Sequence, residues 1–178
     1  MPIRVEPTKE ELIERLDAFL FGWGFKDIGR ASKGGSKLGA FILAACFIDA
    51  MAGFSAGINR SESKHGSTKR FVEFVAKYLP QYNATKIWED LRCGLVHAYA
   101  EGGSYSFTAS NPRVHGMSNG GKVVLNLEDF LSDVECAYSQ LRADILADKN
   151  EAFRKAKRRL SSMGLMGPGN PMADVSAQ

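Results

Sequence analysis

The stretch from Leu38 to Ile48 is the most apolar part of the chain and limits the folds that it can adopt. On a helix these residues are apolar on every side, which is typical of a helix at the centre of a protein. We therefore predict a central helix over about 37–54, with Ser36 as its cap. Asp49 interrupts the apolar run after about eleven residues, whereas a membrane span needs roughly 20. The pattern favours a buried helix and no membrane partner.

Asp49 is the one charged residue that follows this apolar run. A carboxylate in apolar surroundings costs several kcal/mol unless it is paired or protonated. Arg92 is the first candidate for a partner. The alternative is that Asp49 faces solvent near the end of the helix.

The composition places the chain among ordinary globular proteins. Its 178 residues, 44% hydrophobic and 24% charged, suit one domain with a proper core. We expect this domain over 1–163, with its core at about 8–147, and a disordered tail over 164–178. The net charge of +3 excludes a large positive field, so any basic binding surface has to be local.

Cysteine usage indicates a reducing compartment. Cys46, Cys93 and Cys136 are odd in number and far apart, which argues against both a disulfide framework and a zinc site. The first residues contain no apolar segment of a secretory signal. We therefore expect a cytoplasmic protein with no metal and no cofactor.

Hydrophobic periodicity predicts further helices around the central one. Thr8 and Glu11 form a capping box that starts a helix over about 8–21. Gly22 and Gly24 are expected to end it, and to begin a flexible connection that is rich in glycine and lysine and runs to residue 36. A short helix then follows from Ser67 or Thr68 to Pro80.

The next helix, which starts at Asn83 or Thr85 and ends near Tyr99, is followed by a change of period. Tyr105 and Phe107 alternate with polar residues, and Val123 to Leu127 forms a second β-like run. We predict a small two-stranded β-ribbon here. The expected fold is mainly α: a single-domain bundle of four to five helices with this ribbon after the fourth helix.

The last expected helix begins at Asn126 and packs an apolar face on the core up to about 147. Basic residues then accumulate, so we expect the helix to extend into solvent over 148–163. Such a cluster is usual at a solvated helix end, where it complements the helix dipole. Contact with RNA is the alternative. The basic residues are Arg154, Lys155, Lys157, Arg158 and Arg159.

Arg92 and His97 form the segment with the most chemical character, within the run Leu91 to Tyr99. Residues five apart are separated by about 140° around an ideal α-helix, so the two side chains are not expected to face each other. For both to act on one substrate, either the helix deforms near Gly94 or two copies of the chain combine their residues. The second option leads to a dimer with a composite site.

An arginine and a histidine together suit RNA cleavage by the 2′-hydroxyl group. Histidine acts as a general acid or base because its pKa lies near neutrality. Arginine holds the phosphate and stabilises its developing charge. Single-stranded RNA is the natural substrate, because its 2′-hydroxyl is free to align.

This segment resembles the HEPN superfamily (higher eukaryote and prokaryote nucleotide-binding domains). Its ribonuclease members carry an arginine, four to six residues and a histidine at the end of a helix. The resemblance implies that Arg92 and His97 are a catalytic pair at the interface of a homodimer, with Tyr99 placed to stack on a base. Cys93 departs from the asparagine or aspartate that usually follows the arginine. The surrounding sequence is also similar to a group of small bacterial proteins of unassigned function, which adds no activity.

Other interpretations of the same residues stay open. Arg92 and His97 can be structural, with Arg92 paired to Asp49, in a non-catalytic HEPN-like module that dimerises or binds a protein or nucleotide. Cys93 as a nucleophile is a weaker hypothesis, since nothing marks its thiolate as stabilised. Asp49 is also a candidate for a substrate contact, as are Lys64 and His65 in a polar loop over 55–67. His115 is a further candidate, although loop histidines are usually surface residues.

Overall fold

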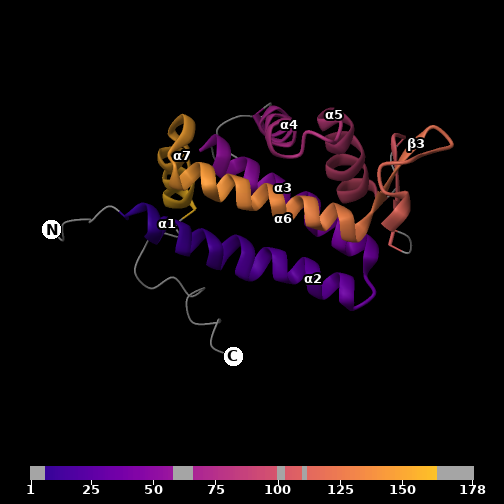
Figure 1. Ribbon diagram of the computed structural model, residues 1–178, viewed down its shortest axis with the longest axis horizontal. Helices are drawn as coiled ribbons and strands as arrows, with labels where there is room; N and C mark the ends of the chain where they lie inside the picture. Colours follow the sequence, from indigo (N-terminus) through magenta and orange to yellow (C-terminus); the bar gives the residue numbers. More distant parts are fainter. Residues whose placement is uncertain (1–6, 58–65, 100–102, 110–111, 164–178) are drawn as a thin grey trace.

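The computed structural model describes residues 7–57, 66–99, 103–109 and 112–163. Within these ranges the chain forms six helical bodies and a small sheet, so the fold is mainly α, as predicted (Figure 1). The predictions for 164–178 and for Lys64 and His65 concern residues outside these ranges. The first body consists of α1 (Lys9–Leu16), η1 (Asp17–Phe25) and α2 (Lys26–Lys33), which follow one another without a break. Another body consists of α5 (Ala84–Ile87), which continues into η3 (Trp88–Ala98). The remaining helices are α3 (Lys37–Ala56), α4 (Gly66–Tyr78), α6 (Leu127–Leu146) and α7 (Ala152–Ser162).

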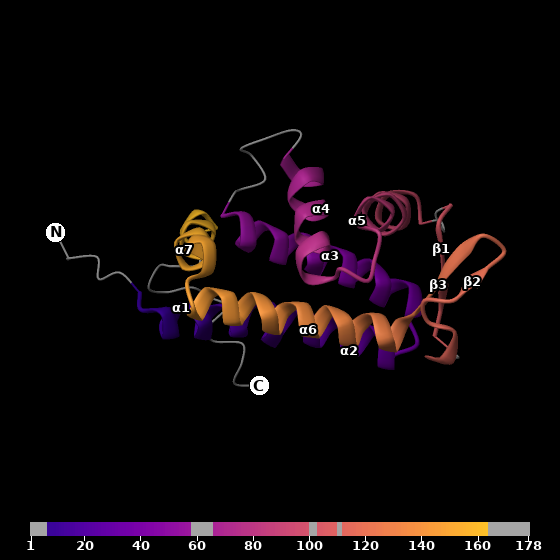
Figure 2. The ribbon, with the colours of Figure 1, turned by 45° about the horizontal axis from the view of Figure 1, so that its top comes forward.

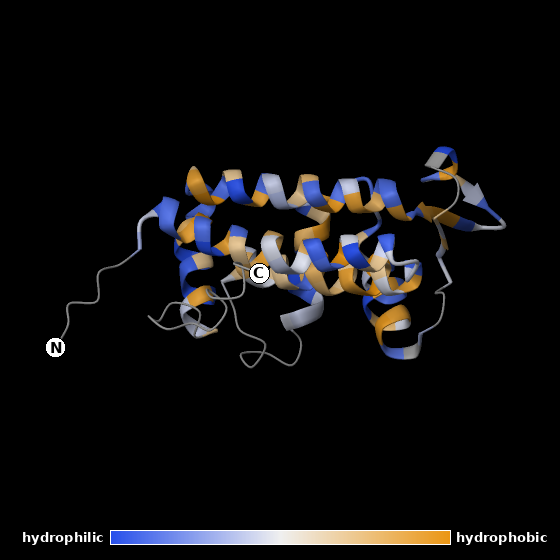
Figure 3. Cartoon of the chain, turned by 90° about the horizontal axis from the view of Figure 1, so that it is seen from below, coloured by the Kyte–Doolittle hydropathy of each residue, from blue (hydrophilic) through white to orange (hydrophobic). Residues whose placement is uncertain are grey.

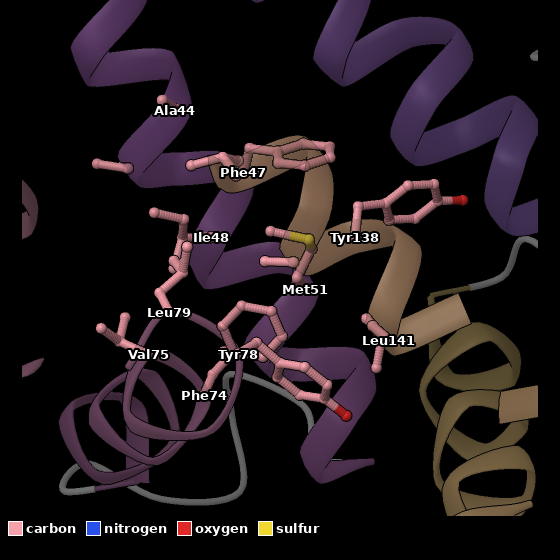
Figure 4. Packing of buried hydrophobic residues seen from close by; sticks show 14 of the residues in the cluster. Ala44, Phe47, Ile48, Met51, Phe74, Val75, Tyr78, Leu79, Tyr138 and Leu141 are labelled. Carbon is pink, nitrogen blue, oxygen red and sulfur yellow. The ribbon is translucent and has the colours of Figure 1, made fainter. Parts of the chain in front are cut away.

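The helix α3 is the centre of the molecule, as its apolar sequence predicts. It packs against α2, α4, α6, α7 and η3. Figures 1 and 2 show α3 beside α6 and the α1–α2 body along the longest axis, with α4 and α5 on another side. Figure 4 shows Phe47, Ile48 and Met51 of α3 among side chains of α4 and α6, and all three are buried.

By length and composition, α3 is the one described helix that is long and apolar enough to cross a membrane. However, 56% of its apolar window is buried inside the molecule. Core helices pass the same test of composition. Figure 3 shows hydrophilic and hydrophobic residues alternating around the longer helices of the bundle.

The first helix begins as predicted and ends later than predicted. Thr8 Oγ1 accepts from the Glu11 amide, and the Thr8 amide donates to the Glu11 carboxylate, which is the expected capping box. Gly22 and Gly24 do not end the helix, because the chain continues through the π-helix η1 into α2. A Cβ atom at Gly24 would lie 3.1 Å from the ring of Phe47. This glycine therefore allows a close helix contact and does not mark a loop.

The β-structure has three strands where two were expected. The predicted strands are present as β1 (Tyr105–Thr108) and β3 (Lys122–Asn126), and they pair in parallel with Tyr105 opposite Val123. The third strand, β2 (Ser118–Asn119), pairs antiparallel with β3. The sequence did not predict β2, because a strand of two residues is too short to show an alternating pattern.

The basic segment after α6 does not extend into solvent as expected. The chain turns sharply over residues 148–151, where Asp148, Asn150 and Glu151 have positive φ angles. As a separate helix, α7 then packs against the C-terminal part of α3 (Figure 2). The expectation was wrong because small apolar residues at helical spacing give α7 a buried face, which comprises Ala152, Ala156 and Leu160.

Candidate functional site

Arg92 and His97 lie side by side on η3, within one chain. The Nη1 atom of Arg92 is 3.4 Å from Nε2 of His97. Residues 88–98 form a π-helix, in which backbone hydrogen bonds join residues five apart and side chains five apart lie close together. The helix is therefore deformed around Gly94, which is the first of the two options that the spacing left open.

Contacts on two sides hold this wide helix in place. Leu91 and Leu95 are completely buried in the core. On another side, the Asp90 carboxylate accepts hydrogen bonds from the backbone amides of Ser104 and Tyr105, at 2.8 and 2.9 Å. The beginning of β1 is thus attached to η3, and Arg92 projects from the helix toward α3.

The end of η3 places its functional candidates in solvent. His97 is exposed, and Tyr99 ends the helix in a left-handed conformation with φ 53°. The Tyr99 amide donates to the Leu95 carbonyl group at 3.1 Å, while its side chain leaves the residue 67% exposed. An exposed aromatic ring therefore follows the histidine by two residues, where the resemblance placed a base-stacking residue.

Asp49 pairs with Arg92, as its position in the apolar helix suggested. The Arg92 Nε atom donates to Asp49 Oδ2 at 3.2 Å. The other oxygen, Oδ1, accepts from Nη2 of Arg70 at 2.9 Å. Asp49 thus contacts two arginines, from α4 and η3, and does not face bulk solvent.

Arg70 is the residue of this cluster that sequence reasoning missed. It lies on the buried side of α4, and only 7% of its side chain is exposed. Its signal in the sequence is its spacing, because Phe74 and Tyr78 follow at four and eight residues and share its face of the helix. An arginine in line with buried aromatic residues needs a partner.

The Arg92 guanidinium group is held from three directions. Besides Asp49 and His97, it lies 5.9 Å from the ring of Trp88. A guanidinium group only donates hydrogen bonds, so Nε2 of His97 is the acceptor in their contact. The contact requires a neutral imidazole whose Nε2 lone pair faces Arg92. This nitrogen can take up a proton as a general base once the contact with Arg92 opens.

The two cysteines nearest the pair are poor nucleophiles. Burial raises the pKa of the Cys93 thiol, while the charge of Arg92 acts in the opposite direction and does not overcome this effect. Cys46 is exposed as a residue, but partial burial of its thiol raises its pKa, against the nearby Arg92. A thiolate at Cys93 is therefore disfavoured at neutral pH.

His115 has a structural environment away from this pair. Its Nδ1 accepts from the Asn126 amide at 3.0 Å, and its Nε2 lies 3.0 Å from the hydroxyl group of Tyr82. That hydroxyl group donates to Asp133, and burial raises the pKa of Tyr82. This network joins the segment before β2 to α6, so His115 is not the free surface residue that its loop suggested.

The described residues contain no group of three or more His, Cys, Asp or Glu side chains that would hold a metal ion. Comparisons with protein-family models, with curated proteins and with solved structures found no match to this chain.

Proposed function

We propose that this protein is a HEPN-like, metal-independent endoribonuclease that acts on single-stranded RNA. The observation that carries the proposal is the contact between Arg92 and the exposed His97 on one face of η3. A charged group that binds phosphate and a group that transfers protons can thereby act on the same phosphodiester. The resemblance of the segment to ribonuclease members of that superfamily agrees with this geometry.

The proposed reaction needs only the RNA and these side chains. Arg92 turns from His97 to the phosphate, which frees Nε2 of His97. The 2′-oxygen attacks the adjacent phosphorus and loses its proton to this nitrogen, and the bond from phosphorus to the 5′-oxygen breaks. A protonated histidine returns a proton to the leaving 5′-oxygen. Arg92 stabilises the charge that develops on the phosphate. The products are a 2′,3′-cyclic phosphate and a 5′-hydroxyl end.

The reaction needs a neutral histidine to take the proton of the 2′-hydroxyl and a protonated histidine to supply one to the 5′-oxygen. A homodimer suits this reaction, because a single histidine has only one of these forms at a time. Two copies provide a histidine for each transfer. The surface proposed for the second copy is on α3, where Leu43 is 38% exposed and Cys46 is also exposed. Cys46 and Asp49 share a face of α3 at a spacing of three residues, so this apolar surface leads to the arginine cluster.

Two further roles belong to the proposal. The exposed ring of Tyr99 is suited to stack on an RNA base, since stacking contributes about 1–3 kcal/mol per base. Lys64 and His65 are proposed as substrate contacts on the basis of the sequence alone. An RNA substrate also agrees with the proposed cytoplasmic location.

The test is cleavage of single-stranded RNA by the purified protein in EDTA, beside His97→Ala and Arg92→Ala. Both variants are checked for folding by circular dichroism and for oligomeric state by light scattering. We expect cleavage by the parent and its loss in both folded variants. If the parent leaves every single-stranded RNA intact, or if the folded variants cleave equally well, the proposal is wrong.

The second candidate is a non-catalytic HEPN-like module that dimerises or binds a protein or nucleotide. The ion pair between Arg92 and Asp49 favours it, because both side chains are largely buried, at 15% and 18% exposed. In that case Arg92→Ala unfolds the protein, while His97→Ala has no effect on any RNA. The same set of variants therefore separates the two candidates.

A further inference from the structure

Arg70 is a deeply buried charged group next to the candidate site. Its side chain is 7% exposed and its Nη2 bonds Asp49. Its Nε atom is buried and has no hydrogen-bond partner among the described residues. A guanidinium group at this depth is costly without a counter-charge, so its place beside Asp49 calls for a physical reason.

The cluster of Asp49, Arg70 and Arg92 contains two guanidinium groups and one carboxylate, which leaves a net charge of +1. In the described part of the chain, Asp49 is the only carboxylate within ion-pair distance of either arginine. Each arginine occupies one oxygen of that carboxylate. The uncompensated charge is therefore shared by a deep arginine and by Arg92, which is the more exposed of the two.

Arg92 has donors left over in this arrangement. Its Nε is used by Asp49 and its Nη1 faces His97, while its Nη2 makes no hydrogen bond within the described residues. A guanidinium group has five N–H donors, and a phosphate is the ligand that fits a pair of them. If Arg70 were neutral, both oxygens of Asp49 would be free to bind Arg92 as a bidentate pair.

We propose that Arg70 is a positioning residue that neutralises Asp49 and so keeps the charge of Arg92 available for a phosphodiester anion. This inference rests on the proposed function, since the anion is the backbone of the single-stranded RNA. Arg70 itself does not touch the substrate. It sets how much of the Arg92 charge the carboxylate consumes.

The test compares charge balance with simple loss of structure. Arg70→Gln makes the cluster neutral, and the double variant Arg70→Gln/Asp49→Asn returns its net charge to +1. Binding is measured with a 2′-O-methyl oligonucleotide, which lacks the attacking hydroxyl group, and cleavage is measured with the matching RNA. Lys69→Gln is the control, because Lys69 neighbours Arg70 on α4 but has a side chain 78% exposed.

We expect Arg70→Gln to weaken oligonucleotide binding by about tenfold, as for the loss of one charge-assisted hydrogen bond. The double variant should recover most of this loss, and Lys69→Gln should stay close to the parent. A purely structural Arg70 would give no recovery, because the double variant removes both charged partners. Unchanged binding in folded Arg70→Gln, or no recovery in a folded double variant, would overturn the inference.

Two outcomes need a second variant or a separate conclusion. If Arg70→Gln does not fold, Arg70→Lys keeps the charge and is expected to bind within about threefold of the parent; a folded Arg70→Lys that binds tenfold more weakly contradicts the inference. If the parent neither binds nor cleaves, the proposed function fails and this inference with it. If the parent is active and Arg70→Gln binds the oligonucleotide as tightly as the parent, the inference alone fails.

Discussion

Asp49 of α3 and Arg92 of η3 form an ion pair across the contact between the central helix and the candidate site, with Oδ2 and Nε 3.2 Å apart. Asp49→Ala removes the carboxylate that pairs with both Arg92 and the deeper Arg70. We expect the free energy of unfolding to fall by about 3 kcal/mol, as for other buried pairs that lose one partner. Urea denaturation measures this loss.

The control for this variant is Asp27→Ala, which breaks an ion pair with Arg30. Both of those side chains are well exposed, at 55% and 75%. An exposed pair contributes about 0–1 kcal/mol, so the control should unfold almost like the parent. Equal effects of Asp49→Ala and Asp27→Ala would show that the cluster around Asp49 does not stabilise the fold.

Gly57 ends α3 with φ 70°, and a Cβ atom there would lie 2.8 Å from the Cα atom of Lys155 in α7. Gly57→Ala therefore combines a strained backbone with a clash against another helix. We expect it to lower the free energy of unfolding by about 2–4 kcal/mol. Gly35→Ala is the matched control, because Gly35 has φ 87° and open space around its Cβ position. A loss of equal size in both variants would mean that α7 does not pack closely on Gly57.

Asp144 makes the stability of the fold depend on acid pH. Burial opposes its ionisation, but hydrogen bonds from Lys77 and Tyr78 outweigh this effect and lower its pKa below the ordinary value of 3.8. A lowered folded-state pKa stabilises the protein above 3.8, and this stabilisation is lost as the pH falls through the folded-state value. We expect the parent to be more stable than Asp144→Asn at pH 6 and to lose that advantage below about pH 3.8. Urea denaturation at pH 6 and pH 3 measures the difference, and a constant difference would contradict this role.

Leu43 tests the surface proposed for the second copy. Because the residue is 38% exposed on α3, Leu43→Glu adds a charge without burying it in the monomer. We expect the proposed homodimer to dissociate in this variant, since an unpaired charge in an apolar interface is costly. Sedimentation velocity measures the oligomeric state. Met117→Glu, at a residue 56% exposed beside the sheet, should leave it unchanged. A dimeric Leu43→Glu variant would place the interface elsewhere.

The sequence by itself determined the parts of the fold that rest on local patterns. An apolar run on all sides predicted the central helix, and Asn126 caps α6 by accepting from the Glu128 and Asp129 amides. Alternation predicted β1 and β3. These features depend on residues close together in the chain, so their physical causes are visible in the sequence.

Only the tertiary structure decided which distant groups meet and what form each helix takes. The π-helical geometry of η3 places Arg92 beside His97, although an ideal α-helix would separate them. Arg70 bonds Asp49, which lies 21 positions earlier in the chain, and α7 packs against α3. The physical reason is that packing between elements determines which partners buried charges and small apolar faces contact. Hydrophobic periodicity within one element predicts which face is buried, but does not predict which element covers that face.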